Sequence, residues 1–321
     1  MDLRPTKRIK FVDFWPGFDP RDNWFTRLLE RRYQLEHADR PDFLVYSCFD
    51  RHRREHLEHD CVRIFYTGEN RRPDWHSCDW AFTFDHTDHP RHLRLPHWVL
   101  KVDPARLVRG ALDTAAVLAR KTKFCAFLVS NPLCRTRNRF FRQLSRHARV
   151  DSGGRVLNNL GGRVADKLRF LADYKFTIAF ENEARPGYTT EKLVEPMLVD
   201  TIPIYWGDPL VGREFDTSSF FHAGDFRSFD ALIERVREVD RDAAQHRAML
   251  ERPWYRGNRV PACADAEAVL DRFTTIFETP VSPVARRLGL GRRLRLDRIP
   301  SQVASARRRL DRRIRKLTSG A

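Results

Sequence analysis

The 321-residue sequence contains no apolar run near the roughly 20 residues that a membrane-spanning helix needs. Its first residues, MDLRPTKRIKFVDFW, lack the apolar core and the small-residue cleavage site of a secretory signal peptide. Cysteine is scarce: six are scattered along the chain with no C-x-x-C pair, which argues against a zinc site and gives no reason to expect disulfides. These absences favour a cytoplasmic protein.

The residues that are present favour a globular protein with a substantial core. Hydrophobic residues make up 41% of the chain and aromatic residues 12%, and the length is sufficient for two domains. The net charge is +16, of which residues 281–321 carry +11 and the first 280 residues only +5. A nucleic-acid enzyme more often spreads its basic residues over the folded body, so this distribution points to another anionic partner for the tail.

Short apolar runs alternate with helical patterns along most of the chain. Runs at 61–66, 124–130 and 175–180 predict buried strands, whereas DNWFTRLLERRY has apolar residues at helical spacing, with Asp22 or Asn23 as N-cap. Mostly continuous apolar strands separated by helices predict parallel sheets. We therefore expect an α/β fold with two Rossmann-like domains, at residues 1–110 and 121–280, and a tail at 281–321.

The tail has a pattern of its own. In SQVASARRRLDRRIRKL, Val303, Leu310 and Leu317 lie seven residues apart, and arginines occupy the other face. This spacing predicts a basic amphipathic helix. The tail could be a solvated extension, a nucleic-acid contact or an anchor at an anionic membrane surface, and its two segregated faces favour the anchor.

The most informative stretch is YKFTIAFENEARPGYTTEKLVEPMLVDTIPIYWGDP, residues 174–209. A predicted strand is followed by a Pro-Gly turn and a helix capped by Thr189 or Thr190. Tyr188, Glu191 and Lys192 then fall at the start of that helix, beside free N–H groups. A lysine there opposes the helix dipole unless an anion lies between them, and a diphosphate would satisfy this need. The alternative is a capped surface helix with solvated charges.

This stretch resembles the donor-binding signature of the α-1,3/α-1,4-fucosyltransferases, Tyr-Lys-Phe … Phe-Glu-Asn … Tyr-x-Thr-Glu-Lys … Ile-Pro-Ile-Tyr-Trp-Gly. The segments VRIFYTGENRRPD, FDHTDHPRHLRLP, SNPLCRTRNRFFRQL and DSGGRVLNNLG resemble bacterial-type members of the family in the same order, so the similarity covers roughly residues 8–277. The resemblance implies two facing Rossmann-like domains of the GT-B type, an inverting reaction, GDP-fucose as donor and a glycan as acceptor.

The resemblance also implies roles for single residues. Glu69, in YTGEN, would be the general base that deprotonates the acceptor hydroxyl. Arg137, Tyr188 and Lys192 would hold the diphosphate, and Glu191 would hydrogen-bond to ribose or fucose hydroxyls. The remaining residues expected to line the nucleotide pocket are Ser130, Asn131 and Asn182. Without the resemblance, Glu69 would be interpreted as an ordinary exposed carboxylate of a loop.

Such a transfer needs a carboxylate opposite the leaving group and cations beside the diphosphate, and no metal is required. We expect no cofactor, with a divalent metal at most stimulatory. One loop contains five residues of metal-ligand type, Asp85, His86, Asp88, His89 and His92. No cysteine or second cluster completes a tetrahedral site there, so a polar loop is favoured.

The sequence therefore predicts a cytoplasmic fucosyltransferase held peripherally at the inner face of the membrane, where lipid-linked glycans are built. Its expected product is an α-1,3 linkage to GlcNAc or a similar sugar. One alternative is a related two-domain transferase that uses another nucleotide sugar. An alternative of another class is a nucleic-acid-binding protein that acts through the basic tail, although we expect no nucleic acid as partner.

Overall fold

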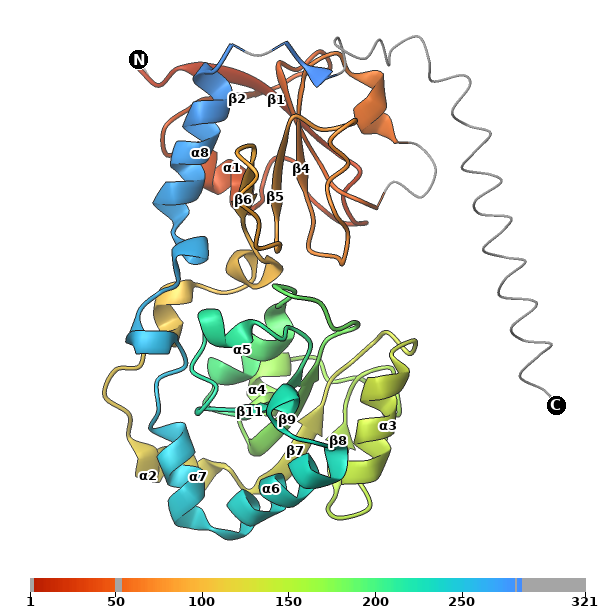
Figure 1. Ribbon diagram of the computed structural model, residues 1–321, viewed down its shortest axis with the longest axis vertical. Coiled ribbons are helices and arrows are strands. Elements are labelled where there is room, and N and C mark those ends of the chain that lie inside the picture. Colours follow the sequence, from red (N-terminus) through yellow and green to blue (C-terminus); the bar gives the residue numbers. More distant parts are fainter. Residues whose placement is uncertain (1–2, 50–53, 281, 285–321) are drawn as a thin grey trace, which may run out of the picture. The chain divides into compact units, whose positions relative to one another are not determined.

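The computed structural model describes residues 3–49, 54–280 and 282–284, so the predicted amphipathic helix of the tail lies outside the described residues. The chain divides into two compact units (Figure 1). Unit 1 combines the residues up to Tyr66 with Pro73–Ala81 and the described residues from Phe273 onward. Unit 2 contains Thr67–Arg72 and Phe82–Arg272.

This division is not linear along the chain, unlike the ranges predicted from the sequence. Residues 82–110 group with unit 2 by their contacts, although β6 (His92–Arg94) in this range is a strand of the first sheet. The described residues from 273 to 280 pack with unit 1, although they were expected in the second. The difference arises because packing partners, and not chain order, define a compact unit.

Among the described residues, the first sheet has the strand order β2-β1-β3-β4-β5-β6. Its strands are β1 (Thr6–Val12), β2 (Gln34–His37), β3 (Phe43–Tyr46), β4 (Val62–Tyr66), β5 (Trp80–Thr83) and β6 (His92–Arg94). β1 pairs in parallel with β2 and β3, and β3 pairs in parallel with β4. β4 is buried at every position, including Arg63, and its other four residues are apolar, as expected for a parallel strand.

Two helices pack on unit 1. In α1 (Trp24–Leu29) the side chain of Asn23 caps the N-terminus and accepts from two backbone N–H groups, as the sequence predicts. The second is α8 (Ala266–Glu278). From this helix, the Phe277 ring lies 5.2 Å from that of Tyr33 and 4.4 Å from that of Phe43. A late segment of the chain therefore completes the core of the first sheet.

Unit 2 is built on a sheet with the order β11-β10-β9-β7-β8. Its strands are β7 (Lys123–Phe127), β8 (Val150–Ser152), β9 (Tyr174–Phe180), β10 (Ile202–Trp206) and β11 (Phe221–His222). The pairings are parallel, and β9 lies between β7 and β10. The carboxyl ends of parallel strands share one edge, so the loops after β7, β9 and β10 are brought together.

The α-helices of unit 2 are α2 (Thr114–Arg120), α3 (Arg135–Leu144), α4 (Lys167–Leu171), α5 (Glu191–Met197), α6 (Phe229–Arg241) and α7 (Ala243–Leu250). Short 3₁₀ helices include η2 (His97–Leu100), η4 (Val211–Arg213) and η6 (Arg256–Asn258). Thr190 is the N-cap of α5, at one of the two positions expected from the sequence. This cap fixes where the residues after β9 enter the helix.

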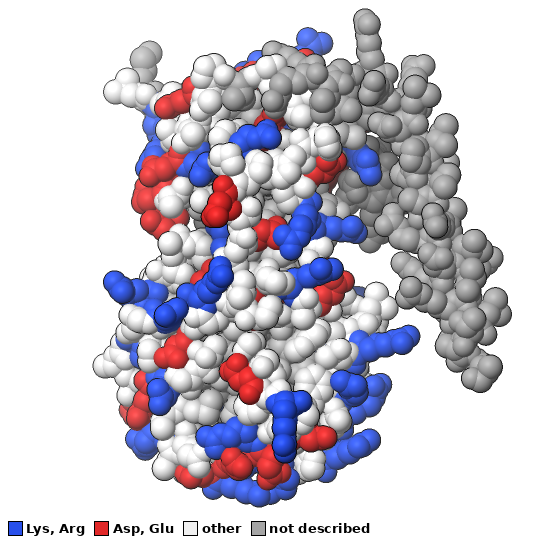
Figure 2. Space-filling model, in the orientation of Figure 1, with Lys and Arg blue, Asp and Glu red and all other residues white. Residues whose placement is uncertain are grey.

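Charged side chains of both signs mix over most of the visible face of unit 2 (Figure 2). Lys and Arg gather along the edge where α3 lies, and Arg135, Arg139 and Arg142 of this helix are exposed. None of the helices in the described part of the chain is long and apolar enough to cross a bilayer.

Candidate active site

The candidate site lies in unit 2, where β9 ends and α5 begins. The turn between them requires glycine at Gly187, which adopts φ +83° and whose added Cβ would lie 2.3 Å from the carbonyl oxygen of Phe84. Asp208, which follows β10, accepts hydrogen bonds from Gly187 N at 2.6 Å and from Thr189 Oγ1 at 3.1 Å. The carboxyl ends of β9 and β10 thus hold one compact turn.

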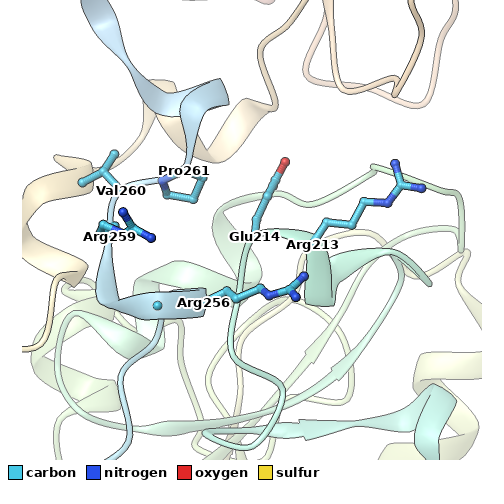
Figure 3. A pocket seen from close by; sticks show the side chains of 7 residues that line it. Arg213, Glu214, Arg256, Arg259, Val260 and Pro261 are labelled. Atoms are coloured by element: carbon cyan, nitrogen blue, oxygen red, sulfur yellow. The ribbon is translucent and has the colours of Figure 1, made fainter.

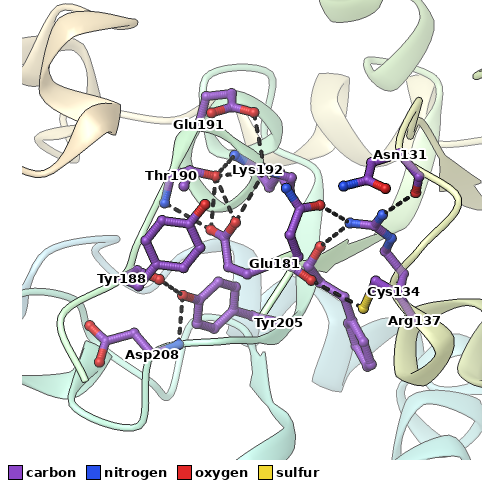
Figure 4. A network of polar contacts seen from close by, with 12 residues as sticks. Asn131, Cys134, Arg137, Glu181, Tyr188, Thr190, Glu191, Lys192, Tyr205 and Asp208 are labelled. Atoms are coloured by element: carbon purple, nitrogen blue, oxygen red, sulfur yellow. Dashed lines mark hydrogen bonds and ion pairs between the residues drawn. The ribbon is translucent and has the colours of Figure 1, made fainter. Parts of the chain in front are cut away.

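Glu181, directly after β9, is the centre of a buried polar network (Figure 4). It has no exposed surface. Its carboxylate accepts hydrogen bonds from the N–H of Thr190 at 2.8 Å and from its Oγ1 at 2.8 and 2.9 Å. The same carboxylate lies 3.1 Å from Lys192 Nζ. Burial raises the pKa of Glu181, while Lys192 and the bonds from Thr190 oppose that rise.

Lys192 is therefore already paired with anions of the protein. Its Nζ lies 3.1 Å from Glu181, 2.9 Å from Thr190 Oγ1 and 3.3 Å from Glu191 Oε1. Burial lowers the pKa of Lys192, but the two carboxylates outweigh it and hold the pKa above its usual value. The sequence suggested that an anion such as a diphosphate would offset a lysine at this helix start. The buried Glu181 performs part of that role.

Glu191 is held in its ionised form by the same cluster. Burial raises the pKa of its carboxyl, but Lys192 and then His97 act against it and lower the pKa to about 2. Glu191 is thus a charged acceptor beside Lys192 at neutral pH. This state suits the hydrogen bonds to sugar hydroxyls that the resemblance implies for Glu191.

Tyr188 presents an unused hydroxyl to this cluster. Tyr188 is 2% exposed, and its ring packs edge to face on that of Phe84, with the two ring centroids 5.0 Å apart. Burial raises the pKa of the phenol, and the carboxylates of Glu181 and Glu69 raise it further. Among the described residues, the Tyr188 hydroxyl has no hydrogen-bond partner, so a neutral donor is available near the carboxylates of Glu181 and Glu191.

Arg137, in the first turn of α3, is fully buried. Its Nη1 donates to the carbonyl oxygen of Phe180 at 3.1 Å and to Asn182 Oδ1 at 3.0 Å, and its Nη2 donates to the carbonyl oxygen of Asn131 at 2.7 Å. Its Nε is buried without a partner among the described residues. Arg137 therefore braces the loop after β7 against the end of β9, and its contact with a phosphate stays a prediction.

The other two residues expected on this side of the pocket are exposed. Asn131 turns its side chain back into its own loop, where Oδ1 accepts from Leu133 N at 2.9 Å. Ser130 is exposed just before it, and among the described residues it has no hydrogen bond to the cluster around Lys192. Both side chains remain accessible to a ligand.

Glu69 lies in the loop after β4 and groups with unit 2. The neighbouring Asn70 side chain bonds to the carboxylate of Glu183, in the turn before α5. The Glu69 side chain is exposed, yet nearby protein groups desolvate its carboxyl enough to raise its pKa. Glu191 adds to this rise, while Lys192 opposes it more strongly. The structure thus brings the predicted base into the electrostatic field of the predicted donor residues.

Sequence reasoning missed Glu181 and the glycine that makes room for it. A Cβ on Gly207 would lie 2.4 Å from Cγ of Glu181. Both residues belong to the stretch at 174–209, and a carboxylate directly after a buried strand was the available signal. Its burial could not be inferred, because charged residues are mostly exposed.

Asp85 and His92, which resemble metal ligands in the sequence, are connected by a hydroxyl. Thr83 Oγ1 donates to Asp85 Oδ2 at 2.8 Å and lies 2.9 Å from His92 Nε2. Across the residues that the structure describes, no group of three or more His, Cys, Asp or Glu side chains could hold a metal ion.

Parallel sheets with an ionised cluster at their carboxyl edge define a Rossmann-like α/β protein, the class that binds nucleotides at this position. Comparison with known families is more specific. Residues 9–101 match the alpha-(1,3)-fucosyltransferase FucT N-terminal domain, and residues 118–270 match the C-terminal domain of glycosyltransferase family 10 (fucosyltransferase). The chain belongs to this fucosyltransferase family, as the resemblance indicated.

Individual relatives agree with this assignment. The alpha-(1,3)-fucosyltransferase FucT of Helicobacter pylori is 33% identical over 207 residues, which cover 54% of this chain and 43% of that protein. The alpha-(1,3)-fucosyltransferase B of Drosophila melanogaster is 34% identical over 116 residues, covering 32% of this chain and 26% of that protein. The chain thus spans less than half the length of these curated relatives.

Solved structures cover more of the chain. The crystal structure of an alpha1,3-fucosyltransferase with GDP has a TM-score of 0.73 and 27% identity, and the match covers 87% of this chain and 92% of that one. The crystal structure of an alpha1,3-fucosyltransferase with GDP-fucose has a TM-score of 0.71 and 26% identity, and the match covers 88% of this chain and 93% of that one. These matches confirm the predicted α/β fold of the GT-B type.

Proposed function

We propose that the protein transfers L-fucose from GDP-fucose to a hydroxyl of a glycan acceptor, with inversion at the anomeric carbon and an α-1,3 linkage to GlcNAc or a similar sugar. The observation that carries this proposal is the cluster of Tyr188, Glu191 and Lys192 around the buried Glu181, in a chain of the fucosyltransferase family. The solved relatives titled with GDP and GDP-fucose support the choice of donor.

In this proposal the cluster binds the diphosphate. Lys192 supplies a positive charge beside it, and the neutral hydroxyl of Tyr188 donates a hydrogen bond to a phosphate oxygen. When the bond between the fucose C1 and the diphosphate oxygen breaks, GDP gains negative charge. Because Lys192 is held in place by Glu181 and Thr190, it stabilises that charge with little reorganisation.

Glu69 takes the proton of the acceptor hydroxyl. As the proton moves to the carboxylate of Glu69, the acceptor oxygen forms a bond to C1 of fucose and GDP leaves from the opposite side. A carboxyl whose pKa is raised by its surroundings is a better base at neutral pH than an ordinary glutamate. The exposure of Glu69 leaves it accessible to an incoming acceptor.

The variant Glu69→Gln tests this role. We expect transfer to fall by about 10²–10⁴-fold, because the general base is lost, while the affinity for GDP stays unchanged. Transfer assays and isothermal titration with GDP measure the two quantities. Glu234→Gln, a change of an exposed carboxylate on α6, is the matched control. Unchanged turnover in Glu69→Gln would exclude Glu69 as the base.

A donor screen separates the main proposal from its nearest alternative. We expect transfer from, or slow hydrolysis of, GDP-fucose, and none with UDP-sugars. If another nucleotide sugar is turned over and GDP-fucose is not, the protein is a related transferase with a different donor. The reaction is proposed to need no metal, so addition of EDTA should leave most of the transfer rate intact.

We also propose that the tail, residues 281–321, holds the enzyme at an anionic membrane surface, since it carries +11 of the net charge. The truncation should follow Val284, because this residue is buried and its N–H donates to Asp79 Oδ1 at 2.8 Å. We expect the full chain, and not the truncated one, to sediment with phosphatidylserine vesicles. Tight, salt-dependent DNA binding that survives the truncation would instead favour the nucleic-acid alternative.

A further inference from the structure

Unit 2 contains a concave site whose lining residues are separate from the cluster around Lys192. It is a hollow of about 440 Å³ between the segments 213–214 and 256–261 (Figure 3). Its volume is within the range of small-molecule sites. The first segment belongs to the chain that follows β10, and β10 pairs with β9. One side of the hollow is therefore connected to the strand next to β9.

The hollow is strongly positive. Arg213, Arg256 and Arg259 line it and are exposed, and within the described residues their side chains form no ion pair or hydrogen bond. The one carboxylate in the lining, Glu214, is already occupied: Arg94 Nε lies 2.5 Å from Oε1 and Nη2 lies 2.9 Å from Oε2. Three guanidinium groups therefore border the hollow with no carboxylate left to neutralise them.

The backbone that presents these arginines is firmly held. Phe215 and Tyr255 form an antiparallel bridge between the two segments, and Arg256 N donates to the carbonyl oxygen of Glu214 at 3.0 Å. Asn258 accepts from Arg109 N at 2.8 Å and donates to the carbonyl oxygen of Arg109 at 2.9 Å. A site whose backbone is fixed before binding loses less entropy when it binds a ligand.

The hollow is also connected to the turn before α5. Arg94, which holds Glu214, donates from Nη1 to the carbonyl oxygen of Gly187 at 3.1 Å. Gly187 directly precedes Tyr188, whose hydroxyl is proposed to meet the donor diphosphate. A single partly buried guanidinium thus links the lining of the hollow to the proposed donor site.

We propose that this hollow binds the anionic group of an acidic acceptor, a sugar that carries a phosphate or a carboxylate. Arginine matches both groups because its planar fork can donate two parallel hydrogen bonds to them. A neutral sugar would leave the three positive charges unmatched. This assignment names the acceptor class and rests on the proposed fucosyl transfer.

Titration of the full-length protein tests the site directly. The probes are N-acetylglucosamine 1-phosphate and glucuronic acid, each compared with its neutral counterpart, N-acetylglucosamine and glucose, in the presence of saturating GDP. We expect the two anionic sugars to bind and the neutral ones to bind much more weakly. The double variant Arg256→Gln/Arg259→Gln should lower the affinity for the anionic probes by about tenfold or more.

The matched control is Arg227→Gln/Arg241→Gln, which removes the same charge from two exposed arginines outside the hollow. It should bind the anionic probes as the wild type does. If both double variants lose the same affinity for the anionic probes, the effect is due to the overall charge of the protein and the proposal is overturned. Displacement of the anionic probes by GDP would also overturn it, because it would place them in the donor site.

Two further measurements separate this proposal from the proposed function. Inorganic phosphate that binds as tightly as the sugar phosphate would show that no sugar is recognised, and would overturn the acceptor assignment. Hydrolysis of GDP-fucose without any acceptor reports on the donor site alone. If this hydrolysis is absent and the arginine variants still lose affinity for the anionic sugars, the proposed function is wrong and the anionic-sugar site is supported. With acidic acceptors, the arginine variants should raise KM and leave kcat unchanged.

Discussion

At the residue scale, the proposed donor site depends on a carboxylate that has no contact with solvent. The carboxylate of Glu181 accepts hydrogen bonds from the N–H and the hydroxyl of Thr190 and from the ammonium of Lys192. Gly207, which has no Cβ, leaves space for the Glu181 side chain. Lys192 is therefore positioned before any ligand arrives. A charged side chain fixed in this way acts as a pre-organised partner for a phosphate.

The substitution Glu181→Gln should separate positioning from charge. The amide can still accept from Thr190, but its NH₂ group would face Lys192 and leave the ammonium with one carboxylate fewer. We expect GDP affinity to fall by about tenfold. Glu238→Gln on α6, where Glu238 pairs with Arg235 at 2.9 Å, is the control and should leave GDP affinity unchanged. Unaltered GDP affinity in Glu181→Gln, measured by titration, would contradict the positioning role.

Acidification should reveal the contribution of Glu191 to stability. Its pKa is lowered from 4.5 to about 2, by Lys192 and His97 against the effect of burial. A carboxyl with a depressed native pKa adds stability above its unfolded pKa and loses that contribution as the pH falls toward the native value. The wild type should therefore lose about 2 kcal/mol more than Glu191→Gln between pH 5 and pH 2.

Urea denaturation at several pH values measures this difference. Burial lowers the pKa of His97 from 6.5 to about 4, so the stability lost through this group falls mainly between those two pH values, above most of the window of Glu191. Parallel curves of stability against pH for the two proteins would mean that the pKa of Glu191 is not depressed.

The sequence predicted the residue types of the site better than their contacts. Tyr188, Glu191 and Lys192 were placed together by their spacing at a helix start, and the structure confirms that they adjoin. For Arg137 the contact with the diphosphate stays a prediction, and the sequence did not indicate that two of its nitrogens bond to backbone carbonyl oxygens. Such bonds depend on how two distant loops pack, and the residue spacing holds no information about that packing.

At the scale of elements, α5 combines a structural cap with the site. Thr190 is 2% exposed, and it caps the helix while also donating to Glu181. Thr190→Ala should lower the free energy of unfolding by about 1–2 kcal/mol and also weaken GDP binding. Ser228→Ala, at the N-cap of α6, is the matched control: it should cost a similar amount of stability without any effect on GDP. Thermal unfolding and titration give both quantities, and equal GDP affinities would contradict the dual role.

Long apolar runs were readily predicted as strands, and short edge strands were not. β4, β9 and β10 follow directly from their buried sequences. β8 has three residues and β11 only two, so neither extends over enough positions to show a pattern. Their strand pairing is determined by the neighbouring strand and not by their own sequence.

At the scale of the whole molecule, unit 1 depends on a helix from the other end of the chain. Phe277 is 8% exposed and contacts the rings of Tyr33, Phe43 and Phe273. Phe277→Ala should destabilise unit 1 by about 3–5 kcal/mol through the cavity it leaves. Hydrogen exchange should show lost protection in β1, β3 and β4, while β9 and GDP binding are unaffected. A uniform loss of protection in both units would contradict this local effect.

The sequence could not reveal this arrangement, although the apolar residues of α8, AEAVLDRFTTIFE, lie at helical spacing. An amphipathic pattern shows that a helix packs on something, but it does not name the partner. The linear ranges 1–110 and 121–280 assigned α8 to the nearer domain for that reason. The packing of Phe277 on Tyr33 could be found only in three dimensions.

The return of α8 to the first sheet also sets an order for biosynthesis. A ribosome releases β1–β4 early, but the residues that complete their core, from Phe273 on, emerge about 200 residues later. At ordinary elongation rates this interval is about 10–40 s. Unit 2 can fold during that time, whereas the apolar strands of unit 1 must wait for their last helix. The nascent chain is therefore expected to need chaperone protection of its N-terminal part until α8 has emerged.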